Sequence, residues 1–438
     1  MMAWTYYDTW IVIIGALAAT ACALPGCFLV LRRMSLMGDA IAHAVLPGIV
    51  VAFVLTQSRA SLPMFLGAVV VGIVTAVLTH WVQHTGKVES QAALGVVFTS
   101  LFALGLILMD RFASAVHLDL DCVLYGALEI APLGNRVPLL GLDVPQPVIV
   151  NGAMLLVNVG VLTLFYKELK VSSFDPALAT SLGINADVMH YLLMGLVAAT
   201  VVAAFESVGS ILVVAMLIVP GAAAYLLTDR LSVMLVLAAV IAIASAVLGH
   251  VGAVLAPVVV GYDTLTSGMM AVAAGLLLLV AMLAGPRHGI VSRAIGQLGL
   301  GVRVAQQDLL GLLYRLEESR AAKGRGEVGL ARRQAMALLA LGPVRAWLVL
   351  DGLRRREAVQ RDAGRYVLTD AGRDEARSLV RSHRLWETYL QQYAGLRADH
   401  LHLSAERLEH ATDEAMQREL ADRTGSPRHD PQGRQIPE

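Results

Sequence analysis

Charged residues are scarce in this sequence, and the scarcity is uneven along the chain. Only 16% of the 438 residues are Asp, Glu, Lys or Arg, against about 25% in soluble domains, and the mean hydropathy is +0.66. Residues 1–284 hold nine of the 34 basic and 14 of the 34 acidic residues. The first two thirds is therefore too apolar for a soluble domain, whereas the last third has a soluble domain's charge content.

Three further absences narrow the function. Only three cysteines occur, none in a metal-binding spacing, and Cys22 and Cys27 lie in an apolar run. The net charge is zero, which gives no bulk attraction to nucleic acid. The phosphate-cradling pattern G-x-x-x-x-G-K-[ST] does not occur. We therefore do not expect the chain to be an enzyme, and any ATP hydrolysis is expected in a separate subunit.

The first two thirds contains nine apolar runs, each about as long as a membrane-spanning helix requires. Pro47-Gly48 and Pro220-Gly221 are expected to interrupt the second and the seventh run. The sequence thus predicts an all-α polytopic membrane bundle. The runs are 10–31, 38–56, 62–82, 92–109, 147–166, 188–205, 208–228, 231–256 and 264–284.

Basic residues set the expected orientation, because cytoplasmic loops are enriched in Lys and Arg. Most of them follow odd-numbered runs, with Arg59, Arg111 and Arg136 as exceptions. We expect the C-terminal third in the cytoplasm and the chain in the plasma (inner) membrane, surrounded by lipid. The residues that indicate this are Arg32, Arg33, Lys87, Lys167, Lys170, Arg230 and Arg287.

Asp39 and His43 are the ionisable pair of most interest in the membrane half. They lie four residues apart at the start of an apolar run, so a helix places both on one face. A carboxylate and an imidazole together suit manganese, zinc or ferrous iron. The alternative is a helix-capping aspartate and a packing histidine. His250 lies near the outer end of a run, where we expect it to be solvated.

Four stretches of the membrane half resemble the permeases of zinc/manganese/iron ABC importers. They are LRRMSLMGDAIAHAVLPGIVVAF at 31–53, DLDCVLYGALE at 119–129, KELKVSSFDPALATSLGI at 167–184 and SVGSILVVAMLIVPGAAAYLLTDRL at 207–231. The resemblance implies a dimeric or pseudodimeric permease, a separate ATPase and an extracellular metal-binding protein. It also makes Asp39 and His43 the metal pathway, and 174–184 a helix that couples to the ATPase. The implied coupling residues are Phe174, Asp175, Pro176, Leu182 and Gly183.

The last third has the pattern of a winged helix-turn-helix followed by a helical domain. Amphipathic helices are predicted at 305–319, 327–340 and 343–356, then two strands around Ala363-Gly364 and a long helix from about Asp370. We accordingly divide the chain at its composition changes. The expected domains are a membrane domain at 1–286, a linker at 287–304, a winged-helix domain at 305–375 and a metal-binding and dimerisation domain at 376–438.

Histidine and glutamate recur at helical spacing near the end of this third. His383 and Glu387 lie four residues apart, and Glu406, Glu409 and His410 share one helix face. Such clusters can hold manganese, iron or cobalt, and a solvated charged helix face is the alternative.

The stretches QDLLGLLYRLEE, YVLTDAGR, HRLWETYL, RLEHA and HDPQGRQIP resemble the metal-responsive repressors of the iron-dependent (diphtheria-toxin) and manganese-responsive type over about 306–437. Asp308 and Glu406 match manganese-type ligands, which favours manganese over zinc or iron. Gly311 stands where the manganese family has a further glutamate. The implied metal ligands are Asp308, His383, Glu387, His402, Glu406, Glu409 and His410.

The expected recognition helix lacks the side chains that read DNA. Leu341 and Trp347 stand where a repressor presents small polar groups to base edges. We therefore expect DNA not to be a partner. The leading hypothesis is import of a divalent transition metal with cytoplasmic feedback. The alternatives are a membrane-tethered metal-dependent transcriptional regulator and a channel or secondary transporter that needs no ATPase.

Overall fold

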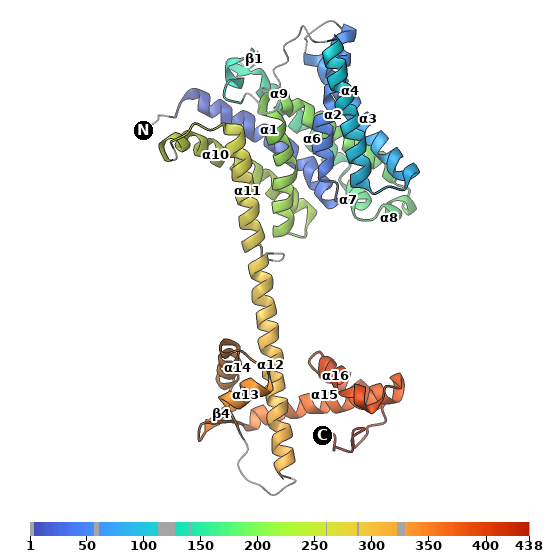
Figure 1. Cartoon of the computed structure of the whole chain (residues 1–438), viewed down its shortest axis with the longest axis vertical. Helices are drawn as coiled ribbons and strands as arrows, with labels where there is room; N and C mark the ends of the chain where they lie inside the picture. The colour runs from blue at the N-terminus through green and yellow to red at the C-terminus, as the bar shows by residue number, and fades with distance from the viewer. Residues whose placement is uncertain are drawn as a thin grey trace. The chain divides into compact units, whose positions relative to one another are not determined.

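The structure is a computed structural model. It describes residues 4–56, 61–112, 128–139, 142–259, 261–286, 289–321 and 329–437. The chain divides into two compact units, Met1–Arg293 and Ala294–Glu438 (Figure 1). Most of the resemblance stretch at 119–129 lies outside the described residues.

The first unit is a helical bundle (Figure 1). Among the described residues, nine helical segments are long and apolar enough to cross a membrane, which confirms the predicted number. Helix α9 supplies two of them. The helices are α1 (Tyr6–Leu31), α2 (Leu36–Thr56), α3 (Ser61–Gly86), α4 (Ser90–Phe112), α6 (Gln146–Leu164), α9 (Ala186–Leu227), α10 (Leu231–Val259) and α11 (Thr266–Ala284).

The interruption in this bundle lies at Gly209 and not where prolines predicted it. Gly209 has φ 77° and is a non-helical position inside α9, near the start of its second span, Ser207–Leu227. Helix continues through Pro47-Gly48 in α2 and through Pro220-Gly221 in α9. Glycine at position 48 instead serves close packing, because a Cβ there would lie 2.4 Å from the carbonyl oxygen of Gly67 in α3.

Buried amides of α6 join the bundle across helices. Asn158 Nδ2 donates to the carbonyl of Ala21 in α1 at 2.8 Å and to Thr200 Oγ1 in α9 at 3.0 Å. Asn151 donates to Ser207 Oγ at 3.0 Å. In lipid a polar group must find its partner inside the protein, so these contacts fix the position of α6.

Short elements connect the spans. The 3₁₀ turn η1 (Ala131–Leu133) precedes a hairpin of β1 (Arg136–Leu139) and β2 (Leu142–Pro145). Helices α7 (Tyr166–Phe174) and α8 (Pro176–Ser181) lie between α6 and α9. Arg32, at the end of α1, donates to Ser173 Oγ at 2.9 Å and to Ser172 Oγ at 3.0 Å, which ties α7 to the first span.

The second unit begins with a winged helix-turn-helix, as predicted. Its elements are α12 (Ile290–Ala321), β3 (Leu330–Ala331), α13 (Arg332–Leu338), α14 (Pro343–Arg355), β4 (Val359–Asp362) and β5 (Arg365–Leu368). The strands form an antiparallel sheet in the order β3-β5-β4. Ala363 and Gly364 have φ of 44° and 82°, which is the positive-φ pair of a tight hairpin turn. Residues 290–304, expected as linker, already belong to α12.

Three helices complete the second unit: α15 (Asp370–Ala394), α16 (Ala398–Glu409) and α17 (Glu414–Arg423). The apolar core of the winged part joins α12 to α14 through residues such as Leu309, Leu313, Val349 and Leu353. The expected boundary at 375/376 falls inside α15, so one continuous helix serves both parts.

Candidate metal sites

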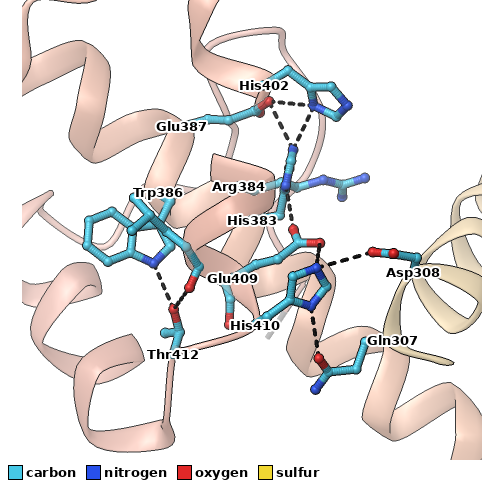
Figure 2. A network of polar contacts seen from close by, with 12 residues as sticks. Gln307, Asp308, His383, Arg384, Trp386, Glu387, His402, Glu409, His410 and Thr412 are labelled. Atoms are coloured by element: carbon cyan, nitrogen blue, oxygen red, sulfur yellow. Dashed lines mark hydrogen bonds and ion pairs between the residues drawn. The ribbon is translucent and has the colours of Figure 1, made fainter. Parts of the chain in front are cut away.

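The first candidate site joins α15 to α16 through three side chains (Figure 2). His383 Nε2 lies 3.1 Å from Glu387 Oε1 and 2.9 Å from His402 Nδ1. His402 Nδ1 lies 3.3 Å from the same Glu387 oxygen. The one-turn spacing of His383 and Glu387 puts both on one face of α15, and these three residues form one group whose ligand atoms lie within 4.8 Å of one another.

The burial and the charge of Glu387 make this first group suitable for a cation. Glu387 is 1% exposed, and its Oε2 has no hydrogen-bond partner among the described residues. A buried carboxylate oxygen without a partner is costly unless something positive binds it. Burial would raise the pKa of Glu387, but hydrogen bonds from His383 and His402 outweigh it and lower the pKa below its usual value. The carboxylate is thus kept ionised for a metal.

The second candidate site brings α12 to the end of α16. Asp308, Glu409 and His410 form a group with ligand atoms within 4.8 Å. His410 Nε2 lies 3.2 Å from Asp308 Oδ1 and 3.9 Å from Glu409 Oε1. Its other nitrogen, Nδ1, lies 2.8 Å from Gln307 Oε1, which orients the ring (Figure 2). The hydrogen bond to Asp308 raises the pKa of His410 against the opposing effect of burial.

Glu409 connects the two groups. Its Oε2 lies 2.5 Å from His383 Nδ1 and 3.9 Å from Arg315 Nη2. Burial lowers the pKa of His383, but its bonds to Glu387 and Glu409 outweigh this and raise it overall. A carboxylate on one ring nitrogen leaves the other to bind metal, the usual outer-shell arrangement of a histidine ligand.

The structure brings six of the seven predicted sensor ligands into these two groups. Glu406 is exposed and lies outside both, although its charge helps to raise the pKa of His410. Position 311 packs inward, because a Cβ on Gly311 would lie 3.3 Å from Leu379 Cδ2. Gln307 and Arg315 were not predicted as partners, and neither shows a ligand spacing in the sequence.

The surface of α14 differs in part from the expectation. Trp347 is 53% exposed, as expected for a position that would face DNA. Leu341, expected beside it, instead lies before α14 and packs against the domain core. The exposed positions of α14 include the apolar Val344, Trp347 and Leu348, where DNA reading needs hydrogen-bonding groups. Arg345, Arg354 and Arg355 are exposed as well, and contacts from them to phosphate would specify no sequence.

Asp39 and His43 lie together on α2. His43 Nε2 is 3.4 Å from Asp39 Oδ1, and the two side chains are 36% and 41% exposed, respectively. The imidazole stacks near Phe98 and packs edge-on near Phe102 of α4, with ring centroids 6.3 and 5.9 Å away. Both polar ends are therefore open at the surface of the single chain, so the pair is not a packed interior contact.

The loop between α6 and α9 forms the predicted short helix. Asp175 caps α8 by accepting from Leu178 N at 3.0 Å, and Pro176 occupies its first turn. Gly183 follows with φ 81°. Phe174 and Leu182 are both 62% exposed, which leaves an apolar surface on either side of the helix.

His250 is buried, contrary to the expectation that it would be solvated. It is 2% exposed, and its Nε2 lies 3.2 Å from Asp8 Oδ1 of α1. No local spacing predicts this pair, since the two residues are 242 positions apart.

Both halves of the chain are similar to known protein families. Residues 6–285 match the ABC 3 transport family, and residues 369–438 match the metal binding and dimerisation domain of the iron dependent repressors. The manganese transport system membrane protein MntD of Bacillus subtilis is 43% identical over 67% of this chain and 97% of its own. The zinc transport system membrane protein TroD of Treponema pallidum is 41% identical over 65% and 76%.

A solved structure agrees with the membrane half. PsaBC from Streptococcus pneumoniae, in complex with a Fab, is 29% identical, with a TM-score of 0.53 over 65% of this chain and 94% of that chain. The chain is thus a multi-pass membrane protein that belongs to the ABC 3 transport family and carries a C-terminal iron-dependent-repressor domain.

Proposed function

We propose that this chain is the permease subunit of a manganese importer whose cytoplasmic C-terminal unit senses the imported metal. The observation that carries the proposal is the presence, in one chain, of an ABC 3 membrane half and two carboxylate–imidazole groups built on α12, α15 and α16. ATP is hydrolysed by a separate ATPase, and an extracellular binding protein delivers the metal.

Asp39 and His43 form half of the metal pathway. This pair offers one carboxylate and one imidazole, and both side chains are partly exposed in the single chain. Transition metals bind four to six ligands, so one pair is too few. A second permease protomer, identical or related, would supply the remaining ligands across the dimer axis.

The exposed segment around α8 docks on the ATPase. Its N-cap and proline give it a defined start, and the exposed Phe174, Leu178 and Leu182 supply an apolar contact surface. Arg32 ties the neighbouring α7 to the end of α1. Movement of the ATPase would thereby reach the first span through packed helices.

Feedback acts through α12. Metal in the second group would hold Asp308 of α12 against Glu409 and His410, and α12 begins six residues after the last span ends. Metal must bind the two transport states with different affinity to change their populations. A C-terminal unit tightened by metal would favour the resting state of the permease.

Manganese is the cargo that the donor chemistry favours. The second group offers two carboxylates and one imidazole, an oxygen-rich set that suits manganese or ferrous iron better than zinc. A relative 43% identical bears the name of a manganese transport protein, and another, 41% identical, that of a zinc transport protein. Zinc and iron are the alternatives that the experiment below separates.

Uptake of manganese, zinc and iron by cells that express this chain with its ATPase and binding protein tests the proposal. Wild type is compared with His43→Ala and with the control His84→Ala, an exposed histidine near the end of α3. Manganese uptake lost only in His43→Ala supports the permease and its pathway. Manganese uptake by His43→Ala that equals the uptake by wild type and by His84→Ala removes Asp39 and His43 from the pathway.

A further inference from the structure

The exposed side of α14 is apolar. Val344 is 70%, Trp347 53% and Leu348 39% exposed. Their spacing of three and four residues places them on one helix face. The inward face of α14 is buried and consists of Ala346, Val349, Leu350 and Leu353. The exposed residues are therefore not needed to hold the domain together.

One stretch of the helix-turn-helix is apolar. An 18-residue stretch that bridges Arg332–Leu338 and Pro343–Arg355 is apolar enough for a membrane-spanning segment, but the two helices are bent by 114° at the break between them. A bent pair with a packed inner face cannot cross a bilayer. Leu338, at the end of α13, is also 60% exposed. The surface has the composition of a segment that lies in a membrane interface.

Arginines accompany the apolar residues. Arg345 and Arg354 are exposed, and neither has an ion-pair partner within the described part of the chain. Arg355 pairs with Asp351 at 2.7 Å. Arginine beside tryptophan and leucine is the combination that binds anionic lipid, with the charge at the headgroups and the apolar groups below them.

We propose that this surface, made of Val344, Trp347, Leu348, Arg345 and Arg354, binds the anionic lipid of the membrane that holds the chain. Helix α12 tethers the unit: it starts six residues after the last span, and Ala305 lies about 22 Å along it from Ile290. Covalent attachment to a membrane-spanning chain raises the effective concentration of lipid. DNA also offers phosphates, but exposed valine, tryptophan and leucine make no hydrogen bonds to base edges.

Quenching of Trp347 by brominated lipid tests this binding in the full chain. Trp4, Trp10 and Trp81 are replaced by phenylalanine, and the chain is placed in nanodiscs with brominated acyl chains. The signal of Trp347 is the difference from the same protein carrying Trp347→Phe, in which Trp386 remains. We expect Trp347 to be quenched in discs that contain phosphatidylglycerol and not in discs of phosphatidylcholine alone. Arg345→Gln should lower the equilibrium constant for binding this lipid about fivefold.

Leu348→Glu should abolish the quenching. Leu403→Glu is its matched control, because Leu403 is 67% exposed on α16, away from this surface. Unchanged Trp386 emission and manganese binding show that each variant is folded. Trp347 unquenched in every lipid, quenched equally in phosphatidylcholine, or still quenched in Leu348→Glu would overturn the proposal. Protection of Trp347 by duplex DNA in place of lipid would overturn it as well.

Discussion

His383 Nδ1 and Glu409 Oε2 lie 2.5 Å apart and join the two candidate metal groups of the C-terminal unit (Figure 2). Because an ionised carboxylate only accepts hydrogen bonds, the contact keeps the proton on Nδ1 and directs Nε2 towards Glu387 and His402. Glu409 therefore serves the second group as a ligand and the first as an orienting partner.

We expect Glu409→Gln to weaken manganese binding in both groups at once. Loss of an orienting carboxylate costs about 10–100-fold in metal affinity, and loss of a ligand adds to it. Manganese titration of the full chain measures the effect, with Glu419→Gln as control because Glu419 pairs with Arg423 on the surface of α17, away from both groups. If Glu409→Gln weakens one group and spares the other, Glu409 does not link them.

Manganese affinity should rise with pH. The pKa values of His383 and His410 are raised above their usual range by carboxylate partners, so both rings hold protons to a higher pH than free histidine. These bonds stabilise the metal-free unit below about pH 6.5, and this stabilisation is lost as the pH rises through the raised pKa values. Metal needs the neutral rings.

Calorimetric titration between about pH 6 and pH 8 checks this dependence. The logarithm of the affinity of each group should rise by up to about one unit per pH unit while its ring with the raised pKa is protonated, because His383 and His410 lie in different groups. An affinity that does not change over this range would show that neither imidazole must lose a proton to bind metal.

Arg384→Met should destabilise the C-terminal unit. Arg384 is 2% exposed and contacts Glu318 Oε2 at 2.5 Å, the carbonyl of Gln435, and Asp430, whose side chain is fully buried. Removing one partner of a buried ion pair costs about 3–5 kcal/mol. Thermal unfolding reports the loss, and Arg377→Met is the control because its pair with Asp374 is exposed. Equal melting temperatures would mean that the C-terminal tail contributes nothing to the fold.

Asp175→Ala should weaken coupling to the ATPase. The substitution removes the N-cap of α8, which contributes about 1 kcal/mol, without touching the membrane spans. Metal-stimulated ATP hydrolysis of the assembled transporter should fall, while Asn185→Ala, which removes the cap of α9, should change it less because that long helix is held by packing. A larger fall in ATP hydrolysis for Asn185→Ala than for Asp175→Ala would show that α8 is only a connector.

Much of the fold was predictable because its signals are local. The nine apolar runs and the turn at Ala363-Gly364 each rest on neighbouring residues. The break in the seventh-span region was misplaced, since proline at 220 is accommodated in helix while Gly209 adopts a positive φ. Such a choice depends on packing around the helix, which the sequence does not display.

The residues of the candidate sites were likewise predictable only where the signal is local. His383 with Glu387 is visible as a helix-face spacing, and Glu409 and His410 were predicted from their spacing to Glu406, which lies outside both groups. Asp308 joins them from another helix and was reached only through resemblance. The contacts of Gln307, Arg384 and Asp8 link residues far apart in the chain. Long-range partners of this kind have no periodic signal.

Metal bound in the C-terminal unit should restrain manganese uptake by the permease. Proteoliposomes that contain this chain and its ATPase, loaded inside with or without manganese, test it through the initial rate of manganese uptake. We expect internal manganese to slow the wild type and to leave Asp308→Asn uninhibited, because Asp308 is the ligand that α12 contributes to the second group, with equal rates for both when no manganese is inside. Inhibition of wild type and variant to the same extent would contradict it.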